Sequence, residues 1–239
     1  MSTDWSALAT TITDALHLDA PPVAITFADE RPDGIRSFDA PMSEPTADGR
    51  SGRVPAGCVF WMCAVDKTFA TAPEDHGNCS VGSLTHGLKS LEEVAGREDV
   101  SALLSSGWVT ADMVPGIPTV SKKPASIVYG PLAETPIDPD VVLLRVNGRQ
   151  MMVLSDAISD LRIEGKPQCH IVAIAKEQGV AAASVGCALS RARTGMQASE
   201  MTCAIPAAGL AAVTRRVKDT AAVDTVVAKY AANDARRFA

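Results

Sequence analysis

A short internal repeat that begins at a cysteine constrains this chain more than any other feature of its sequence. Residues 79–88 and residues 187–196 both read cysteine, seven further residues, glycine and then leucine or methionine, without a gap. A second cysteine precedes each copy, Cys58 in the first half and Cys169 in the second. Self-similarity of this kind is typical of folds built from repeated units. We therefore expect two degenerate half-repeats that pack about a pseudo-twofold axis.

The pattern of apolar residues predicts one compact α+β domain over residues 1–239. Apolar side chains at steps of three and four predict helices, at residues 5–16, 58–68, 91–104, 150–161 and 169–178. Alternating or β-branched runs predict strands, at residues 23–27, 125–129, 141–146, 180–186 and 200–205. We expect the half-repeats over approximately residues 20–120 and 138–215, a long loop over 29–55 and a helical tail over 206–235.

Composition limits the classes of function that the chain can have. With 28 acidic and 22 basic side chains, the net charge of −6 has the wrong sign for a protein whose main partner is nucleic acid or an anionic membrane. The N-terminus lacks the basic start and apolar run of a signal peptide, and no apolar stretch reaches the roughly 18 residues of a membrane span. We therefore expect a cytoplasmic protein that binds neither nucleic acid nor a membrane. The sequence carries no signal for an oligomeric state.

The repeat sorts the six cysteines into two groups. In a reducing compartment cysteines are buried thiols or metal ligands rather than a disulfide framework. Cys63 follows Cys58 by five residues, which is about 140° around a helix, and we expect it to be a core residue. Cys203 alternates with apolar residues on a predicted strand and is also expected to be buried. The other cysteines hold repeated positions and would converge between the halves, namely Cys58, Cys79, Cys169 and Cys187.

Several segments of the chain are together similar to a known family. They are Pro22–Ile25, Cys58–Trp61, Glu74–Gly82, Pro139–Leu143 and Ser184–Cys187, followed by Glu200–Met201 and Ala204–Pro206. Spread over nearly the whole chain, they resemble domain of unknown function family 169. The resemblance implies chemistry centred on cysteine and supplies no substrate.

Four converging cysteine thiolates predict an iron–sulfur cluster, with four iron and four sulfide ions. Such clusters normally take four cysteine ligands, which can lie far apart in the sequence. The predicted ligands are Cys58, Cys79, Cys169 and Cys187. A cluster at the seam of two half-repeats could exchange electrons with a partner. If only three cysteines bind, one iron stays open as a Lewis acid, as in a lyase or an oxidoreductase.

Two alternatives to a cluster enzyme follow from the same residues. A structural zinc ion could be bound by three cysteines and a histidine, namely Cys58, Cys63, His76 and Cys79. This set requires Cys63 and Cys58 to face the same point and leaves the repeat unexplained. Alternatively, the protein could be a non-catalytic carrier or sensor that changes shape with the redox state of its cofactor.

Polar residues beside the cysteines predict that the site acts on a small anionic molecule. His86 and Arg191 are the candidate catalytic residues, and His76 and Arg193 are candidates for supporting the metal ligands. Gly82 and Gly186 would let the backbone approach a ligand closely.

Overall fold

The strands of the chain form one sheet, in the order β2-β3-β1-β4-β7-β6-β5. The computed structural model describes residues 3–39, 56–164 and 167–234. Its strands are β1 (Val23–Ala28), β2 (Phe69–Thr71), β3 (Ser126–Pro131), β4 (Val141–Val146), β5 (Arg162–Glu164), β6 (Ala182–Ser184) and β7 (Met201–Pro206). Neighbouring strands are antiparallel except for the parallel pair of β5 and β6. The protein is therefore a mixed α+β fold with a seven-stranded sheet.

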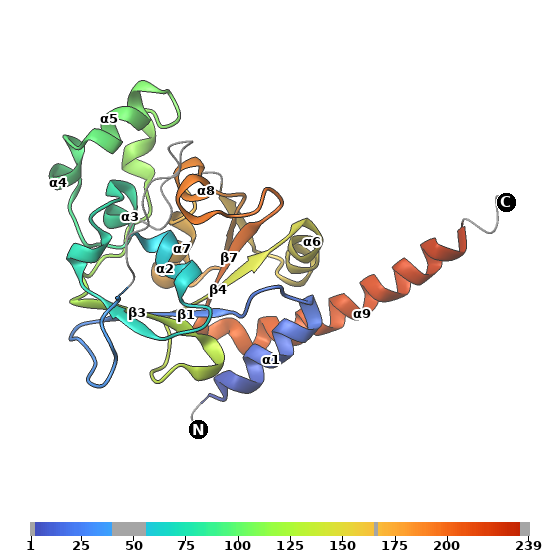
Figure 1. Cartoon of the computed structure of the whole chain (residues 1–239). Helices are drawn as coiled ribbons and strands as arrows, with labels where there is room; N and C mark the ends of the chain where they lie inside the picture. Colours follow the sequence, from blue (N-terminus) through green and yellow to red (C-terminus); the bar gives the residue numbers. More distant parts are fainter. Residues whose placement is uncertain (1–2, 40–55, 165–166, 235–239) are drawn as a thin grey trace.

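Along the chain, helices precede, separate and follow the strands. The α-helices are α1 (Trp5–Leu16), α2 (Gly57–Cys63), α3 (Ser80–Thr85), α4 (Leu91–Ala95), α5 (Glu98–Ser105), α6 (Gly148–Ala157), α7 (His170–Gln178), α8 (Ala188–Thr194) and α9 (Leu210–Asp234). Short 3-10 turns are η1 (Pro73–His76), η2 (Ala111–Gly116), η3 (Leu132–Glu134) and η4 (Ala207–Gly209). Figure 1 shows α1 and α9 on the opposite side of the sheet from α2, α7 and α8. No helix of the described ranges is long and apolar enough to span a membrane.

The strands adjacent to β1 and β4 pair in matching registers. Val23, the first residue of β1, lies opposite Pro131, the last residue of β3. In the same way Val141, the first residue of β4, lies opposite Pro206, the last residue of β7. The central strands β1 and β4 are themselves antiparallel neighbours. The order, direction and register of strands therefore match on the two sides of the central pair.

The match extends to the next strand on each side. Phe69 in β2 lies opposite Tyr129, and Ala182 in β6 lies opposite Ala204. Each of these partners stands two residues before the proline that ends its strand. A short 3-10 turn then follows β3 and β7 alike. Strand β5, at the edge beyond β6, has no counterpart beyond β2 among the described strands.

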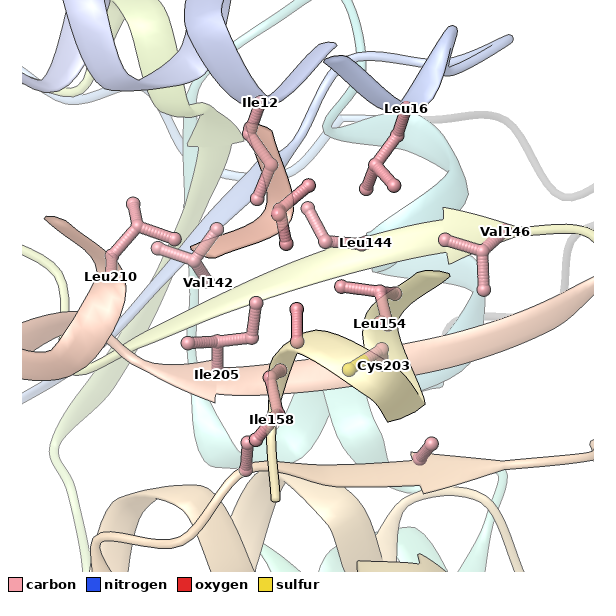
Figure 2. Close-up of a cluster of buried hydrophobic side chains, with 14 of the residues drawn as sticks. Ile12, Leu16, Val142, Leu144, Val146, Leu154, Ile158, Cys203, Ile205 and Leu210 are labelled. Atoms are coloured by element: carbon pink, nitrogen blue, oxygen red, sulfur yellow. The ribbon is translucent and has the colours of Figure 1, made fainter. Parts of the chain in front are cut away.

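The two faces of the sheet carry separate hydrophobic cores because side chains alternate along a strand. In β4, Leu144 packs in the core under α1, α6 and α9, while Leu143 packs in the core with α2 and α7. Figure 2 shows the first core, where Ile12 of α1 points toward the sheet and Cys203 of β7 sits among aliphatic side chains. Full burial of one such aliphatic side chain contributes roughly 1.5–3 kcal/mol.

Several predicted elements differ from those observed. The helix expected over residues 58–68 ends at Cys63, and Phe69 pairs in β2 instead. The helix expected over 91–104 is two helices, with Gly96 as the C-cap of the first. The helical tail begins with η4 and continues as α9 to Asp234, and its expected last residue, 235, lies outside the described residues. Most of the expected loop, at residues 40–55, also lies outside them.

Candidate functional site

Four cysteines from four separate elements line one cavity. Cys58 lies in the first turn of α2, and Cys79, Cys169 and Cys187 are the residues that immediately precede α3, α7 and α8. The cavity has about 30 Å³ of free space, and all four side chains contribute to its wall. The structure therefore brings together the four cysteines that the repeat selects. Their role as ligands stays a prediction.

Cys79 and Cys187 have similar backbone conformations. Both are extended, with φ/ψ of −143°/104° and −133°/135°. The backbone N–H of Gly82 donates to Sγ of Cys79 at 3.4 Å. The side chain of Cys187 makes no such capping hydrogen bond with α8. A sulfur placed before a helix can accept from N–H groups that have no partner within the helix, and only Cys79 of this pair does so.

The backbone conformation explains why each repeated segment has a glycine. Gly87 and Gly195 have φ of 70° and 68°, in the left-handed region that favours glycine. At Gly87 a Cβ atom would also lie 2.4 Å from the carbonyl oxygen of Val120. The motif therefore encodes a cysteine, a short helix and a left-handed turn.

Burial favours the protonated thiol at Cys58, Cys169 and Cys187 when no cation is bound. Burial, together with the neighbouring sulfurs of Cys79 and Cys187, raises the pKa of Cys58 to about 12. Burial also raises the pKa of Cys169 well above its ordinary value, with Cys79 as the next cause. A bound cation reverses this preference because it stabilises thiolates.

Three polar side chains of the cavity wall have a buried atom without a hydrogen-bond partner among the described residues. They are Nε2 of His86, Oε1 of Gln168 and Nη1 of Arg193. Nδ1 of His86 lies 2.7 Å from the carbonyl oxygen of Gly82 and donates to it, which leaves Nε2 as an acceptor. Burial lowers the pKa of His86 to about 4, so the ring is neutral at pH 7.

The residues of the zinc alternative are not gathered at one point. Cys63 and His76 do not contribute to the cavity wall. Nε2 of His76 lies 3.0 Å from Oγ1 of Thr71, and its ring packs against Phe60. Within the described ranges, no three side chains of His, Cys, Asp or Glu form a group that could hold a single metal ion. The same holds for the four cysteines, whose side chains line the cavity.

Comparison with known proteins places the chain in a family. The family model DUF169, described as uncharacterised ArCR, matches residues 11–216. The chain belongs to the DUF169 family. Neither the curated proteins nor the solved structures give a match. In this DUF169 protein the matched range includes all four cysteines of the cavity.

Arg191 of this DUF169 protein does not occupy the position that we expected for a catalytic cation. Its guanidinium donates to the carbonyl oxygens of Val185 at 2.8 Å, Gln197 at 2.6 Å and Glu200 at 2.8 Å. It is not part of the cavity wall, where Arg193 stands instead. Arg191 therefore links the segment that precedes α8 to the segment that follows it.

Gly186 and Gly82 also make contacts within the fold. Gly186 has φ of 117°, and a Cβ atom there would lie 2.9 Å from Nε of Arg191, so its open face is covered by the guanidinium. The N–H of Gly82 is directed at Cys79. Gln168, whose Nε2 donates to Oγ of Ser190, was not among the predicted site residues. No motif marks Gln168, although it adjoins Cys169 in the sequence.

Proposed function

We propose that this protein binds a four-iron four-sulfur cluster through four cysteines, Cys58, Cys79, Cys169 and Cys187. The observation that carries the proposal is their convergence: they are far apart in the sequence, each stands at the start of a different helix, and all line one cavity. Iron–sulfur clusters are normally held by four cysteine thiolates in this way. When bound, a cluster supplies electron transfer or, at an iron without a cysteine, a Lewis acid.

The donor set fits a cluster better than a single ion. The sulfurs that share one zinc ion all lie about 2.3 Å from it, and no group of side chains in the described part of the chain is arranged to hold one ion. In a cluster each cysteine binds a different iron, so the sulfurs stand around a volume. The backbone N–H of Gly82 already donates to Cys79, and hydrogen bonds of this kind tune the potential of a cluster.

The cavity must widen to admit a cluster. Its free space of about 30 Å³ is smaller than a four-iron unit. Two side chains of its wall, Leu103 and Trp108, belong to the segment that contains α5 and η2. Neither α5 nor η2 contains a buried residue. Elements with few buried contacts open at low cost in free energy, so this segment is the part of the wall that can move.

We further propose that the fold consists of two half-repeats related by a pseudo-twofold axis between β1 and β4. The matching registers of β2-β3-β1 and β6-β7-β4 support this proposal, as do the similar backbone conformations of Cys79 and Cys187. Strand β3 would then belong to the first unit, which would extend beyond the expected end near residue 120. Each unit contributes two of the four cysteines.

An enzyme is favoured over a carrier by the polar atoms left without partners. His86, Gln168 and Arg193 line the cavity, and each has one such atom. An unpartnered buried polar atom costs about 1–3 kcal/mol, and a bound substrate would recover this free energy. A lyase or an oxidoreductase that acts on a small anionic substrate fits these groups. An electron-transfer partner stays a prediction.

Anaerobic purification with iron, sulfide and zinc analysis tests the cluster. We expect about four irons and four sulfides per chain. The protein should absorb at about 400 nm, and this absorption should bleach on reduction. Replacing Cys58, Cys79 or Cys187 by Ala should remove most of the iron. Cys63→Ala and Cys203→Ala are matched controls that should retain it, because these cysteines do not line the cavity. Zinc at one per chain without iron, or equal iron in all five variants, contradicts the proposal.

A further inference from the structure

An apolar stripe on the last turns of α9 is exposed in the described chain. The first half of α9 packs against α1 and α6, with Val217 in the core. Figure 1 shows the second half extending away from the rest of the molecule, and residues 225–233 are all exposed. The large apolar side chains of this half are exposed by 62% at Val223, 66% at Val226, 58% at Val227 and 57% at Tyr230. Exposed apolar side chains that lie together mark interaction surfaces.

We propose that a second copy of this chain covers the stripe, and that the two α9 helices form a short parallel coiled coil about a twofold axis. The inference does not rest on the proposed cluster. Val226, Val227 and Tyr230 follow Val223 by three, four and seven residues, which is the spacing of one helix face. In a heptad written a to g, Val223 and Tyr230 then hold a positions and Val226 holds the d position between them. A β-branched residue at a favours the pairing of two helices.

The composition of the projecting turns supports a partner for them. Helices shorter than about 12–15 residues are marginally stable in water without packing contacts, and residues 225–233 are exposed. Valine adds a further cost because its side chain loses rotational freedom in a helix. Burial of the valine side chains between two helices offsets both costs.

Charge complementarity selects a parallel second copy. In a parallel pair, each g residue lies beside the e residue five positions later in the other helix, and the twofold axis repeats every contact. Ala222 at g would lie beside Val227 of the second copy, which extends the apolar contact. Lys229 at the next g would lie beside Asp234 of the second copy, which forms an ion pair across the interface. An antiparallel pair sets g beside g, so Lys229 and Asp234 would not meet.

The position of the stripe leaves room for both folded domains. Thr214 is buried against the domain and precedes Val223 by nine residues, which is about 900° of rotation, so the two lie on opposite faces of α9. The domains of a pair would therefore lie on its outer sides. Arg216 and Asp219, one heptad before Val223 and Val226, are exposed and polar, which confines the apolar contact to the projecting half.

An anionic membrane fits the stripe less well. Helices that lie on such membranes carry a basic polar face. From Asp219 to Asp234 the acidic side chains outnumber the basic ones, with Asp224 as the third acidic residue and Lys229 as the single basic residue.

Sedimentation velocity of the full-length, anaerobically purified protein tests the inference. Because the interface is small, association should be weak, and the monomer should convert toward a dimer between about 5 µM and about 500 µM. Val226→Glu should weaken dimerisation by about tenfold or more, because it buries like charges against each other. Ala228→Glu, an exposed position on the opposite face of α9, is the matched control and should leave dimerisation unchanged.

A mixture of two charge-reversed variants tests the parallel arrangement. Lys229→Glu and Asp234→Lys each place like charges at both ion pairs of their own dimer, whereas a mixed dimer has opposite charges at both. The mixed dimer should therefore form at least about fivefold more tightly than either variant alone. A monomer at every concentration, a dimer that Val226→Glu does not weaken, or a mixture without this gain overturns the inference. A monomer that binds anionic phospholipid vesicles through Val226 also overturns it and assigns the stripe to a membrane.

Discussion

Cys79 and Cys187 stand at equivalent positions, each the last extended residue before a short helix and each eight residues before a glycine with positive φ. The equivalence concerns two short segments that are far apart in the sequence. It places a sulfur at the start of each of two short helices, and both sulfurs line the cavity. The two glycines differ in their surroundings.

Substitution of the two repeated glycines should destabilise the protein unequally. Gly195→Ala places a side chain at φ of 68° with no atom within 4 Å of its Cβ, so the expected loss is about 1 kcal/mol from backbone strain. Gly87→Ala adds a contact of 2.4 Å with the carbonyl oxygen of Val120, and a loss above about 2 kcal/mol is expected. Urea denaturation of both variants measures the difference. Equal losses would show that the contact at Val120 relaxes freely.

Arg191→Lys should lower stability although it keeps the charge. The guanidinium donates to three carbonyl oxygens on both sides of α8, and a lysine ammonium cannot reproduce this planar geometry. A loss of about 1–3 kcal/mol in the free energy of unfolding is expected. Arg193→Lys, on the same helix, is the control and should cost less. A larger loss in the control than in Arg191→Lys would mean that we have exchanged the roles of the two arginines.

The position of Arg191, outside the cavity wall, shows what the sequence leaves undetermined. Residues two apart on a helix point about 200° away from each other, so only one of Arg191 and Arg193 can face the cavity. The sequence contains no feature that sets the rotation of α8. Contacts with residues distant in the sequence, such as Val185 and Glu200, decide it.

Long periodic elements were predictable, and several short ones were not. The steps of three and four in α1 and the β-branched run of β4 are strong signals, and both elements were predicted at their observed positions. Strands β2 and β5 have three residues each, too few for alternation to be recognised, whereas the equally short β6 lies within the predicted strand at residues 180–186. The convergence of the four cysteines was predictable because the repeat relates positions that no local pattern connects.

Acid should destabilise the protein before its carboxylates titrate. Burial lowers the pKa of His86 and of His170 from 6.5 to about 4, and burial also lowers the pKa of His76. Below pH about 6.5 the unfolded chain therefore binds protons that the folded chain does not. Stability is fully present above that pH and is lost as the pH falls toward 4. Each of these histidines contributes up to about 1.4 kcal/mol per pH unit within that window.

Substitution of His86 should weaken the dependence of the free energy of unfolding on pH, because one titrating group is removed. His86→Asn retains a donor for the carbonyl oxygen of Gly82 but cannot titrate. The free energy of unfolding, measured in urea between pH 7 and pH 5, should therefore fall less steeply in this variant than in the unaltered protein. His17→Asn is the matched control, because this exposed residue has φ of 53°, which asparagine tolerates. Its slope should equal that of the unaltered protein. An unchanged slope in His86→Asn would mean that His86 gains its proton in the folded state as readily as in the unfolded chain, and the neutral acceptor assigned to Nε2 would be wrong.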